Sequence, residues 1–397
     1  MGLERAASID DLRLRARRRI PRFAFDLVDG GAEDERNMRR NVEALQEIEL
    51  TPRYMVDVSN VDTRVTLFGQ TYDAPFGMAP IGMLNAFWPD ADRTLARLCK
   101  RRNIPYVASS AASTTLESLA EAADGNGWFQ LYVSSDADVT EGLIARAEAA
   151  GYTTLMVTAD VPAAGKRDRD IRNRLAVPFR ITPEVVAGLI AHPRWSLETL
   201  IHGKPNIANY ADLLQSATSY ADVQKTLITP GFTWEGLKRL RARWHGTLLV
   251  KGILHPQDAV TCADLGCDGL VVSNHGGRQV AFGPATIDAL PAIAGAVGER
   301  LTLILDSGIR RGADIVRARA CGADFVLAGR AFAYGVGAGG KAGAGRATDI
   351  LQLELARALG QLGVPAFGEV GPSARSTFRH GPGQHGPRNS AALRDGG

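Results

Sequence analysis

The stretch LVVSNHGGRQ, residues 270–279, places two reactive side chains three residues apart at the end of an apolar run. His275 can take up and release a proton near neutral pH. Arg278 offers a planar fork of N–H donors that suits a carboxylate or a phosphate. A strand that ends here would deliver both side chains to one edge, and Gly276 and Gly277 would keep that edge open to a ligand. This placement raises the question of what chemistry the two side chains would perform at such an edge.

A second group of residues is typical of a phosphate site. DSGIRRG (306–312) and AGR (328–330) each follow an apolar run. Glycines let backbone N–H groups approach an anion, and arginines add charged donors. Asp306 would repel a bare phosphate, but it could accept hydrogen bonds from hydroxyl groups beside one. The stretches therefore favour a polyol phosphate over inorganic phosphate. The donors would be Gly308, Gly329, Arg310 and Arg330.

A rival phosphate signal is weaker. GVGAGGKA (335–342) is similar to a P-loop through Gly340 and Lys341, but Ala342 stands where Ser or Thr should hold magnesium. The segment also follows the helix-like AFAYGV instead of opening directly from a strand. It therefore favours a helical connection made of small residues over a nucleotide-triphosphate site.

The elements that must position these groups form one repeated pattern. Eight short apolar runs alternate with helical patterns such as VTEGLIARAEAAG, and continuous apolar runs are typical of strands covered on both faces. This alternation predicts an α/β fold, a (β/α)₈ TIM barrel. A doubly wound open sheet is the alternative. The runs lie at 76–80, 105–110, 128–133, 154–160, 248–252, 269–276, 301–308 and 325–330.

Polar residues follow nearly every predicted strand, whereas the strand interiors are apolar. In such barrels the active site lies at the C-terminal ends of the strands, so these side chains should face one mouth. They are Pro80, Ile81, Gly82, Ser109, Gln130, Tyr132, Thr158, Asp160, Lys251, Ser273, His275, Arg278, Asp306 and Arg330.

Three segments lie outside the eightfold pattern. Residues 1–72 should form helices and a hairpin that caps the barrel, with Met38, Val42, Leu45 and Ile48 on one helical face. Residues 73–370 form the barrel, and 161–232 are too long for an ordinary loop after the fourth strand. The Pro-, Gly- and Ser-rich tail 371–397 is expected to be disordered.

The bulk composition excludes several classes of protein. The chain has 397 residues, a net charge of +3 and no block of basic residues, so nucleic acid is not expected as a partner. No apolar stretch is long enough for a membrane span, and the N-terminus does not resemble a signal peptide. The four scattered cysteines predict buried thiols in a reducing, cytoplasmic compartment, with neither disulfides nor a metal site.

With these residues placed, the chain resembles the FMN-dependent 2-hydroxy-acid dehydrogenases and oxidases. That family includes flavin-type L-lactate dehydrogenases, glycolate oxidase and mandelate dehydrogenase. SNHGGRQ, FQLYV, TADVP, LVKGI and DSGIRRG carry the resemblance, which runs from about Ile9 to Val364. It implies a barrel that binds FMN and oxidises an L-2-hydroxy acid to the 2-oxo acid, and the phosphate of FMN fits the polyol phosphate inferred above.

The resemblance also implies roles for single residues. His275 matches the catalytic base, and Asp160 matches the acid that orients it. Arg278 and Arg167 match the two guanidiniums that hold the substrate carboxylate. Tyr132 matches a phenol that binds the substrate's oxygens.

The remaining matches are flavin contacts. Lys251 matches a lysine beside the ring, where it would stabilise negative charge. The other matched residues are Pro80, Ile81, Gly82, Ser109, Gln130, Thr158, Ser273, Asp306, Ser307, Gly308, Arg310, Gly329 and Arg330.

One stretch departs from the family's pattern. Many members carry a tyrosine in the second helix that also binds the carboxylate, but AFDLVDGG has Phe25 and Leu27 where tyrosines are usual. Losing one contact to a charged group costs about 1.5–3 kcal/mol of binding. We expect catalysis to survive and substrate affinity or identity to change.

The insertion bears on partners and location. Residues 178–215 mix apolar side chains with Arg194, Trp195 and Lys204, and they resemble the segment that attaches some bacterial members to membranes. A soluble lid or a subunit contact is the alternative. Peripheral attachment to the inner face of the cell membrane would favour a quinone or another carrier over dioxygen as electron acceptor. The resemblance further implies a homo-oligomer, with a tetramer favoured.

The substrate is predicted to be an aromatic or medium-sized L-2-hydroxy acid, mandelate-like or lactate-like. Ala111, Ala112 and Ala163 are small residues near the mouth and would leave room for a bulky side chain. Two other classes were weighed. A type 2 isopentenyl diphosphate isomerase does not account for Arg167 and Arg278 beside a histidine, and a non-catalytic flavin-binding relative does not account for the presence of both His275 and Asp160.

Overall fold

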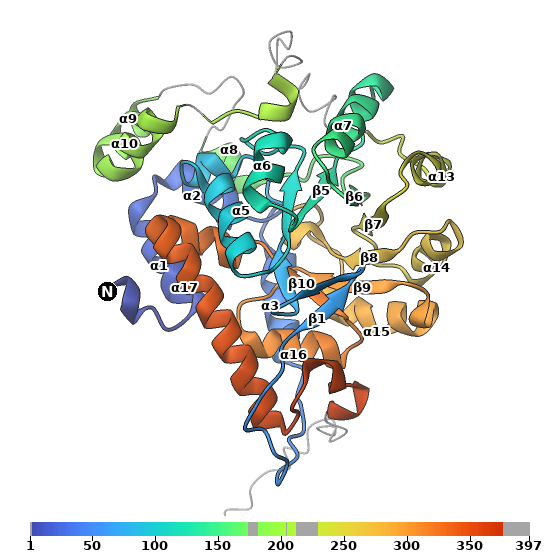
Figure 1. Ribbon diagram of the computed structural model, residues 1–397. Coiled ribbons are helices and arrows are strands. Elements are labelled where there is room, and N and C mark those ends of the chain that lie inside the picture. Colours follow the sequence, from blue (N-terminus) through green and yellow to red (C-terminus); the bar gives the residue numbers. More distant parts are fainter. Residues whose placement is uncertain (1, 174–181, 204, 212–228, 376–397) are drawn as a thin grey trace, which may run out of the picture.

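The computed structural model describes residues 2–173, 182–203, 205–211 and 229–375. At its centre, eight parallel strands close into a barrel in the order β10-β3-β4-β5-β6-β7-β8-β9, as Figure 1 shows. The predicted (β/α)₈ barrel is thus confirmed, and each strand lies in one of the eight predicted runs, with at most one residue outside it. The strands are β3 (Phe76–Met78), β4 (Tyr106–Ser109), β5 (Gly127–Leu131), β6 (Thr154–Thr158), β7 (Thr247–Lys251), β8 (Gly269–Val272), β9 (Thr302–Asp306) and β10 (Phe325–Ala328).

The strands have no polar face because both of their faces are covered. Side chains that point inward, such as Met156, Leu249 and Ile304, pack against one another inside the barrel. Outward side chains such as Leu155 and Leu270 join a second cluster with the surrounding helices. The barrel is therefore a packed core, and polar groups can gather only at the strand ends.

Helices follow every strand. Several begin with the capping residue that the sequence supplies; the Thr115 side chain, for example, accepts a hydrogen bond from Ser118 N at the start of α6. The helices are α4 (Leu84–Phe87), α5 (Ala91–Arg101), α6 (Leu116–Ala123), α7 (Ala137–Ala149), α13 (Trp234–Arg243), α14 (Pro256–Asp264), α15 (Thr286–Val297), α16 (Gly312–Ala320) and α17 (Arg330–Leu362).

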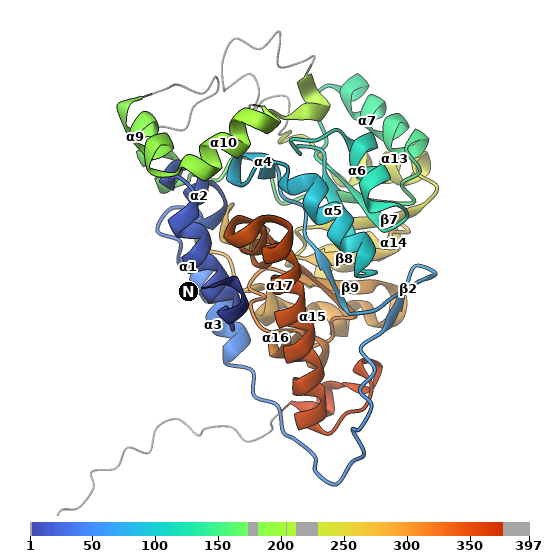
Figure 2. The same ribbon diagram turned by 60° about the vertical axis from the view of Figure 1, so that its left-hand side comes forward.

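The first 72 residues form three helices and a hairpin. A hairpin of β1 (Val65–Leu67) and β2 (Gln70–Tyr72) closes the N-terminal end of the barrel, where the Tyr72 hydroxyl accepts a hydrogen bond from Trp128 Nε1 at 3.2 Å. Helix α1 lies along α17, as Figures 1 and 2 both show. The helices are α1 (Ile9–Arg19), α2 (Arg22–Asp29) and α3 (Arg36–Gln46).

The face that α3 buries differs from the predicted one. Of the four expected apolar residues only Leu45 is fully buried, whereas Asn37 and Asn41 are each 2% exposed. Both asparagines bind Asn274, which precedes His275: its Nδ2 donates to an Oδ1 of each at 2.7 Å. The face of α3 that is buried is therefore determined by hydrogen bonds to Asn274 at the end of β8 as well as by apolar packing.

The segment that resembled a P-loop lies inside α17. Residues 335–342 are helical apart from a kink at Gly339 and Gly340. This confirms the predicted helical connection. A Cβ on Gly337 would come within 2.7 Å of Ile20 and Phe87, so the small residues serve the close approach of neighbouring helices.

The described part of the insertion after β6 holds three helices, α8 (Asp168–Arg172), α9 (Pro183–Ala191) and α10 (Pro193–His202). The last two extend away from the barrel beyond α2 and α4 (Figures 1 and 2). Trp195 fixes α10 there by donating from Nε1 to the Phe87 carbonyl at 2.9 Å. No helix in the described residues is long and apolar enough to cross a membrane.

Only the first residues of the predicted tail, 371–375, are described. Residues 372–374 form a short 3-10 turn, and Arg375 bridges to Leu50, whereas 376–397 lie outside the described residues. The four cysteines are buried and unbridged, as predicted from their spacing.

Candidate active site

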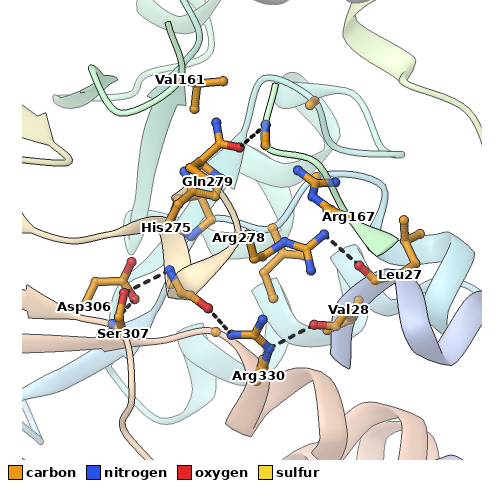
Figure 3. Close-up of a pocket in the computed structure, with 18 of the residues that line it drawn as sticks. Leu27, Val28, Val161, Arg167, His275, Arg278, Gln279, Asp306, Ser307 and Arg330 are labelled. Atoms are coloured by element: carbon orange, nitrogen blue, oxygen red, sulfur yellow. Dashed lines mark hydrogen bonds between the residues drawn. The ribbon is translucent and has the colours of Figure 1, made fainter. Parts of the chain in front are cut away.

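A cavity of about 510 Å³ lies at the C-terminal ends of the barrel strands, and residues at or just beyond the ends of all eight strands line it. Figure 3 shows part of this lining. Most of the predicted site residues meet here. The lining includes Pro80, Ile81, Gly82, Tyr132, Arg167, Lys251, His275, Arg278, Asp306, Ser307, Gly308, Arg310, Gly329 and Arg330. The other predicted residues, Ser109, Gln130, Thr158, Asp160 and Ser273, are not part of that lining.

His275 is held between an acid and a phenol. Its Nδ1 lies 2.9 Å from Asp160 Oδ1, and its Nε2 lies 3.3 Å from the Tyr132 hydroxyl. A carboxylate can only accept, so the proton sits on Nδ1 and Nε2 carries the lone pair. The imidazole therefore turns a basic nitrogen away from Asp160 and toward Tyr132, which lines the cavity.

The electrostatics of this group keep the imidazole neutral and Asp160 charged. Burial lowers the pKa of His275 below its usual value, although Asp160 acts in the opposite direction. Burial would raise the pKa of Asp160, but Lys251 and His275 outweigh it and the pKa is lowered. Burial raises the pKa of Tyr132, which stays a neutral donor. A neutral imidazole beside a fixed carboxylate is ready to accept a proton.

Lys251 links this group to the next strand exits. It is 3% exposed, and its Nζ lies 3.4 Å from Asp160 Oδ2 and 3.7 Å from Asp306 Oδ2. Ser273 joins them, since its hydroxyl accepts from Lys251 at 3.0 Å and donates to Asp306 at 2.8 Å. One buried cation thus stands between two carboxylates and borders the cavity.

The other polar strand residues form a chain of their own. The Ser109 hydroxyl donates to Gln130 Oε1 at 2.7 Å, and Gln130 Nε2 donates to Thr158 Oγ1 at 2.9 Å. The Gln130 amide thereby has a fixed orientation across neighbouring strands. These residues lie next to the lining, and their contact with the flavin stays a prediction.

The chain leaves β8 through three residues in the left-handed region. His275, Gly276 and Gly277 have φ values of 58°, 66° and 70°. A Cβ on Gly277 would lie 2.4 Å from Met38 N, and one on Gly276 would lie 2.8 Å from Arg330 Nη1. The glycines are needed for a tight exit against α3 and Arg330, and Gly276 also lines the cavity, as expected of a residue that keeps this edge open. A strained histidine is typical of functional sites.

Two arginines of the cavity are anchored on backbone carbonyls at the end of α2. Arg278 donates from Nη1 to Gly30 at 2.6 Å and from Nη2 to Leu27 at 2.9 Å. Arg330 donates from Nε to Val28 at 2.9 Å and from Nη2 to Gly30 at 2.7 Å. Each guanidinium has five N–H donors, so both keep donors for a ligand.

Within the described residues neither arginine forms an ion pair, although Asp170 lies near Arg278 and Asp29 and Asp306 lie near Arg330. Burial and the charge of Arg167 lower the pKa of Arg278 well below its usual value, and burial lowers that of Arg330. A buried cation held by neutral carbonyls is stabilised when an anion arrives. This part of the cavity is therefore suited to negatively charged groups.

Arg167 comes from the insertion and meets Arg278 across the cavity (Figure 3). Its Nη1 lies 3.6 Å from Asp170, and within the described residues its buried Nε has no hydrogen-bond partner. The two guanidiniums and His275 therefore border one space, with donors left to bind a small carboxylate.

The part of the cavity around Arg310 and Arg330 carries the predicted phosphate residues. It borders Arg278, because Arg278 and Arg330 donate to the same Gly30 carbonyl. Gly329 and Arg330 lie where β10 passes into α17, so the N-terminus of a long helix points its N–H groups there. The guanidinium of Arg310 lies 5.8 Å from the centre of the Tyr334 ring. Asp306 and Ser307 stand between this part and Lys251 in the cavity wall.

Several lining residues were not predicted. Gln279 closes the signature HGGRQ, and its Oε1 accepts from Gly165 N at 3.0 Å, which ties the insertion to β8's exit. Asp170, Ile171 and Ile207 come from the insertion, where no periodic signal marks them. Of the three small residues expected at the mouth, only Ala111 lines the cavity. Ala112 and Ala163 do not; Ala112 is fully buried, and Ala163 is exposed beside Ala164, which lines the cavity instead.

Comparison with known proteins places these features in a family. A model of the FMN-dependent dehydrogenases matches residues 16–377. The chain is 37% identical to the (S)-mandelate dehydrogenase of Pseudomonas putida over 369 residues, 92% of either protein. It is 40% identical to an L-lactate dehydrogenase of Caulobacter vibrioides over 362 residues, 90% of this chain and 94% of that protein. A crystal structure of the monotopic membrane protein (S)-mandelate dehydrogenase superposes with a TM-score of 0.89 at 35% identity, covering 94% of this chain and 100% of that one.

Proposed function

This chain belongs to the FMN-dependent dehydrogenase family, and we propose that it oxidises an L-2-hydroxy acid to the 2-oxo acid with His275 as the base. The assigned residue roles rest on one observation: His275, Arg167 and Arg278 line the same cavity. The family match gives no support to the alternative of a type 2 isopentenyl diphosphate isomerase.

The cavity fits FMN. Its cationic end, with Arg310, Arg330 and the α17 N-terminus, suits a phosphate, and Asp306 and Ser307 beside it suit hydroxyl groups. Buried Lys251 would place positive charge beside the polar edge of the ring. FMN, when bound, accepts the two electrons that the substrate gives up.

The residues of the chain handle the proton and the acid group. His275 Nε2 takes a proton from the substrate, and Asp160 stabilises the imidazolium through Nδ1. Arg167 and Arg278 hold the carboxylate, which orients the substrate before the reaction. Tyr132, kept neutral, donates a hydrogen bond to a substrate oxygen.

The preferred substrate carries an aromatic or medium-sized side chain. The lining of the cavity includes the apolar side chains of Leu27, Met83, Ala111, Val161, Ile171 and Ile207. Such a lining binds a phenyl group better than a methyl group because more apolar surface leaves water. The small side chain of Ala111 supports this assignment.

Anaerobic reduction tests both the activity and the substrate class. We expect (S)-mandelate to bleach the flavin absorbance of the yellow protein, and a panel with L-lactate and glycolate to give the highest kcat/KM for the aromatic acid. Bleaching by none of these acids would favour the non-catalytic alternative. Turnover of lactate alone would refute the aromatic preference.

We also infer a peripheral membrane contact through residues 178–215. In the described part, α9 and α10 expose Ile190, Leu200 and Ile201 at 75%, 81% and 67%. Trp195, which is buried, holds these helices against the body of the protein. Large apolar side chains on an anchored helical pair are typical of interfacial binding. The similar mandelate dehydrogenase is described as a monotopic membrane protein.

Sedimentation with phosphatidylcholine–phosphatidylglycerol vesicles tests this contact. The native protein should pellet with the vesicles, and Leu200→Ser with Ile201→Ser should leave it in the supernatant. Leu353→Ser, which changes an apolar residue that is 50% exposed on α17, is the matched control and should pellet. Membrane contact would favour a quinone over dioxygen as electron acceptor.

The homotetramer also stays a prediction, which analytical ultracentrifugation would test.

A further inference from the structure

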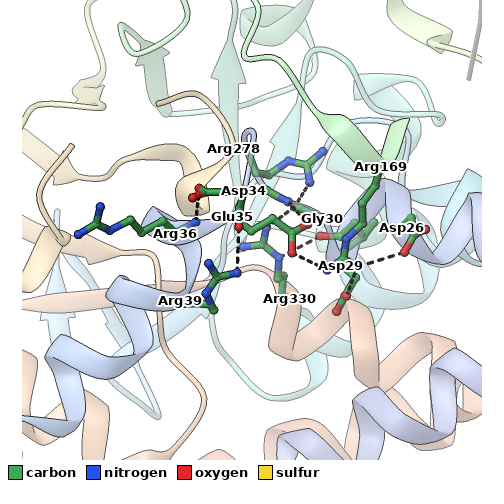
Figure 4. A network of polar contacts seen from close by, with 12 residues as sticks. Asp26, Asp29, Gly30, Asp34, Glu35, Arg36, Arg39, Arg169, Arg278 and Arg330 are labelled. Carbon is green, nitrogen blue, oxygen red and sulfur yellow. Dashed lines mark hydrogen bonds and ion pairs between the residues drawn. The ribbon is translucent and has the colours of Figure 1, made fainter. Parts of the chain in front are cut away.

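The turn between α2 and α3, residues 29–35, contacts the segment that carries Arg167 (Figure 4). The contact is made by Arg169 of α8. Its Nη1 donates to Asp29 at 2.7 Å and to Asp26, just before the turn, at 3.1 Å, while its Nη2 donates to Glu35 at 2.5 Å. One guanidinium thus joins α8 to three carboxylates.

The same turn also holds Arg278. The Gly30 carbonyl accepts from Arg278 Nη1 at 2.6 Å, and Ala32 N donates to the Gly277 carbonyl at 2.8 Å. The two arginines that face the substrate carboxylate are therefore fixed to one short stretch of backbone, Arg278 directly and Arg167 through its neighbour Arg169.

The Arg167 side chain is only weakly held by its own contacts. Its ion pair with Asp170 spans 3.6 Å, and within the described part of the chain its Nε has no partner. The Lys166 carbonyl accepts from Glu33 N at 2.8 Å, which again attaches this segment to the turn. The place of Arg167 must therefore come from its segment, whose charged anchor is Arg169.

The anchor is firm because its charges are buried and fully paired. Asp29 is 1% exposed and also accepts two hydrogen bonds from Arg13, at 2.6 and 2.9 Å, and one from Tyr334, at 2.7 Å. Burial would raise the pKa of Asp29, but these donors lower it, so it stays ionised. Loss of Arg169 would take one cation away from these carboxylates, although Arg13 and Tyr334 would still bind Asp29.

We propose that Arg169 is a positioning residue for substrate binding: it sets the spacing of Arg167 and Arg278 by fixing α8 to the turn that holds Arg278. This inference rests on the proposed role of the two arginines. A merely structural Arg169 would affect stability but would not act through Arg167 on carboxylate affinity.

The test measures binding of phenylacetate, which has the carboxylate but no hydroxyl to oxidise, by its effect on the flavin spectrum of the holoenzyme. Arg169→Gln should raise the Kd for phenylacetate and the KM for (S)-mandelate about 10-fold, as expected when a contact to a charged group is misplaced. The kcat should stay within about threefold, since uniform binding is what is lost. Arg172→Gln is the matched control, because Arg172 lies on the same helix, is 67% exposed and, among the described residues, forms an ion pair only with Asp168 of α8.

Arg167→Gln separates the inference from the proposed function. If Arg167→Gln leaves the phenylacetate affinity unchanged, the role of Arg167 in the proposed function is wrong. If Arg167→Gln weakens binding but Arg169→Gln does not, only the inference is overturned. A residue that acts through Arg167 should add nothing in the double variant, so fully additive losses would also overturn it.

A milder variant keeps the inference testable if Arg169→Gln does not fold. Glu35→Gln preserves the size of a side chain that receives Arg169 and removes its charge. It should weaken phenylacetate in the same direction by about two- to fivefold. An unchanged Kd in folded Glu35→Gln would count against the inference.

Discussion

The two sides of the cavity hold their charged groups in different ways. On the strand side, the exits of β6 to β9, Lys251 and His275 both contact Asp160 directly. On the helix side, formed by α2, α8 and the turn between α2 and α3, Arg167 and Arg278 owe their place to contacts with residues distant in the sequence. The barrel register places the first set, and long-range ion pairs and backbone carbonyls place the second.

The charge balance of the two sides differs as well. Lys251 lies between Asp160 and Asp306, so the strand side carries its own counter-charges. Burial lowers the pKa of Arg278, whose bonds on the helix side are to neutral carbonyls. The strand side can therefore move a proton with little change in its surroundings, whereas the helix side is completed by an anion. The variants below alter one side at a time.

His275→Asn should have the largest effect, and only on the strand side. Without the base, kcat should fall about 10⁴-fold, the upper end for a positioned base. Phenylacetate affinity should stay within about threefold because the arginines are untouched. Stopped-flow flavin reduction and spectral titration measure both. A loss in kcat below tenfold would remove His275 from the role of base.

Asp160→Asn should lower kcat less, by about 10²- to 10³-fold, because the base remains but loses its orienting acid. The pH dependence of kcat/KM gives a more specific test of the role of Asp160. His275 acts when neutral, and its lowered pKa lets kcat/KM persist below the usual imidazole value of about 6.5 before it falls with decreasing pH. Asp160 raises this pKa, so its loss should move the acid limb to lower pH. A limb that moves to higher pH would contradict the arrangement.

The strand side was predictable from sequence because each polar residue directly follows an apolar run. Tyr132, Asp160 and His275 needed only the closure of a barrel to meet, and the alternating pattern predicts that closure. The orientation of His275 was not predictable, since its φ of 58° and the clash that excludes a Cβ at Gly277 depend on α3.

The helix side was only partly predictable. Resemblance identified Arg167, but no local pattern indicates that Arg169 binds Asp26, Asp29 and Glu35, over 130 positions away in the chain. The buried face of α3 was mispredicted for the same reason, because Asn37 and Asn41 look like solvated residues until Asn274 supplies their partner. Pairing between distant polar groups leaves no periodicity in a sequence.

Asn41→Leu tests the hydrogen bonds between Asn41 of α3 and Asn274 at the exit of β8, which connect the two sides. Asn41 and Asn274 exchange hydrogen bonds at 2.8 and 2.7 Å in a buried place, so the change removes one partner from each end of the Asn274 amide, which keeps Asn37 and Gly277. The free energy of unfolding should drop by about 1–3 kcal/mol in urea titrations. Gln46→Leu, at an exposed position of the same helix, should change it by under about 0.5 kcal/mol. Equal stability of the two variants would show that the Asn41–Asn274 hydrogen bonds do not contribute to the free energy of unfolding.

Leu27→Tyr should have the smallest effect and act on the helix side alone. Leu27 lines the cavity, and its carbonyl accepts from Arg278 Nη2 at 2.9 Å. A phenol there would add one donor for the carboxylate, so the KM for a small acid such as lactate should fall about 5- to 10-fold. It would also occupy part of the apolar lining, so the KM for mandelate should fall less or rise. The kcat should hardly move, because the strand side keeps its bonds. An unchanged KM for every accepted acid would mean that residue 27 does not face the bound carboxylate, and that Arg167 and Arg278 grip it from elsewhere in the cavity.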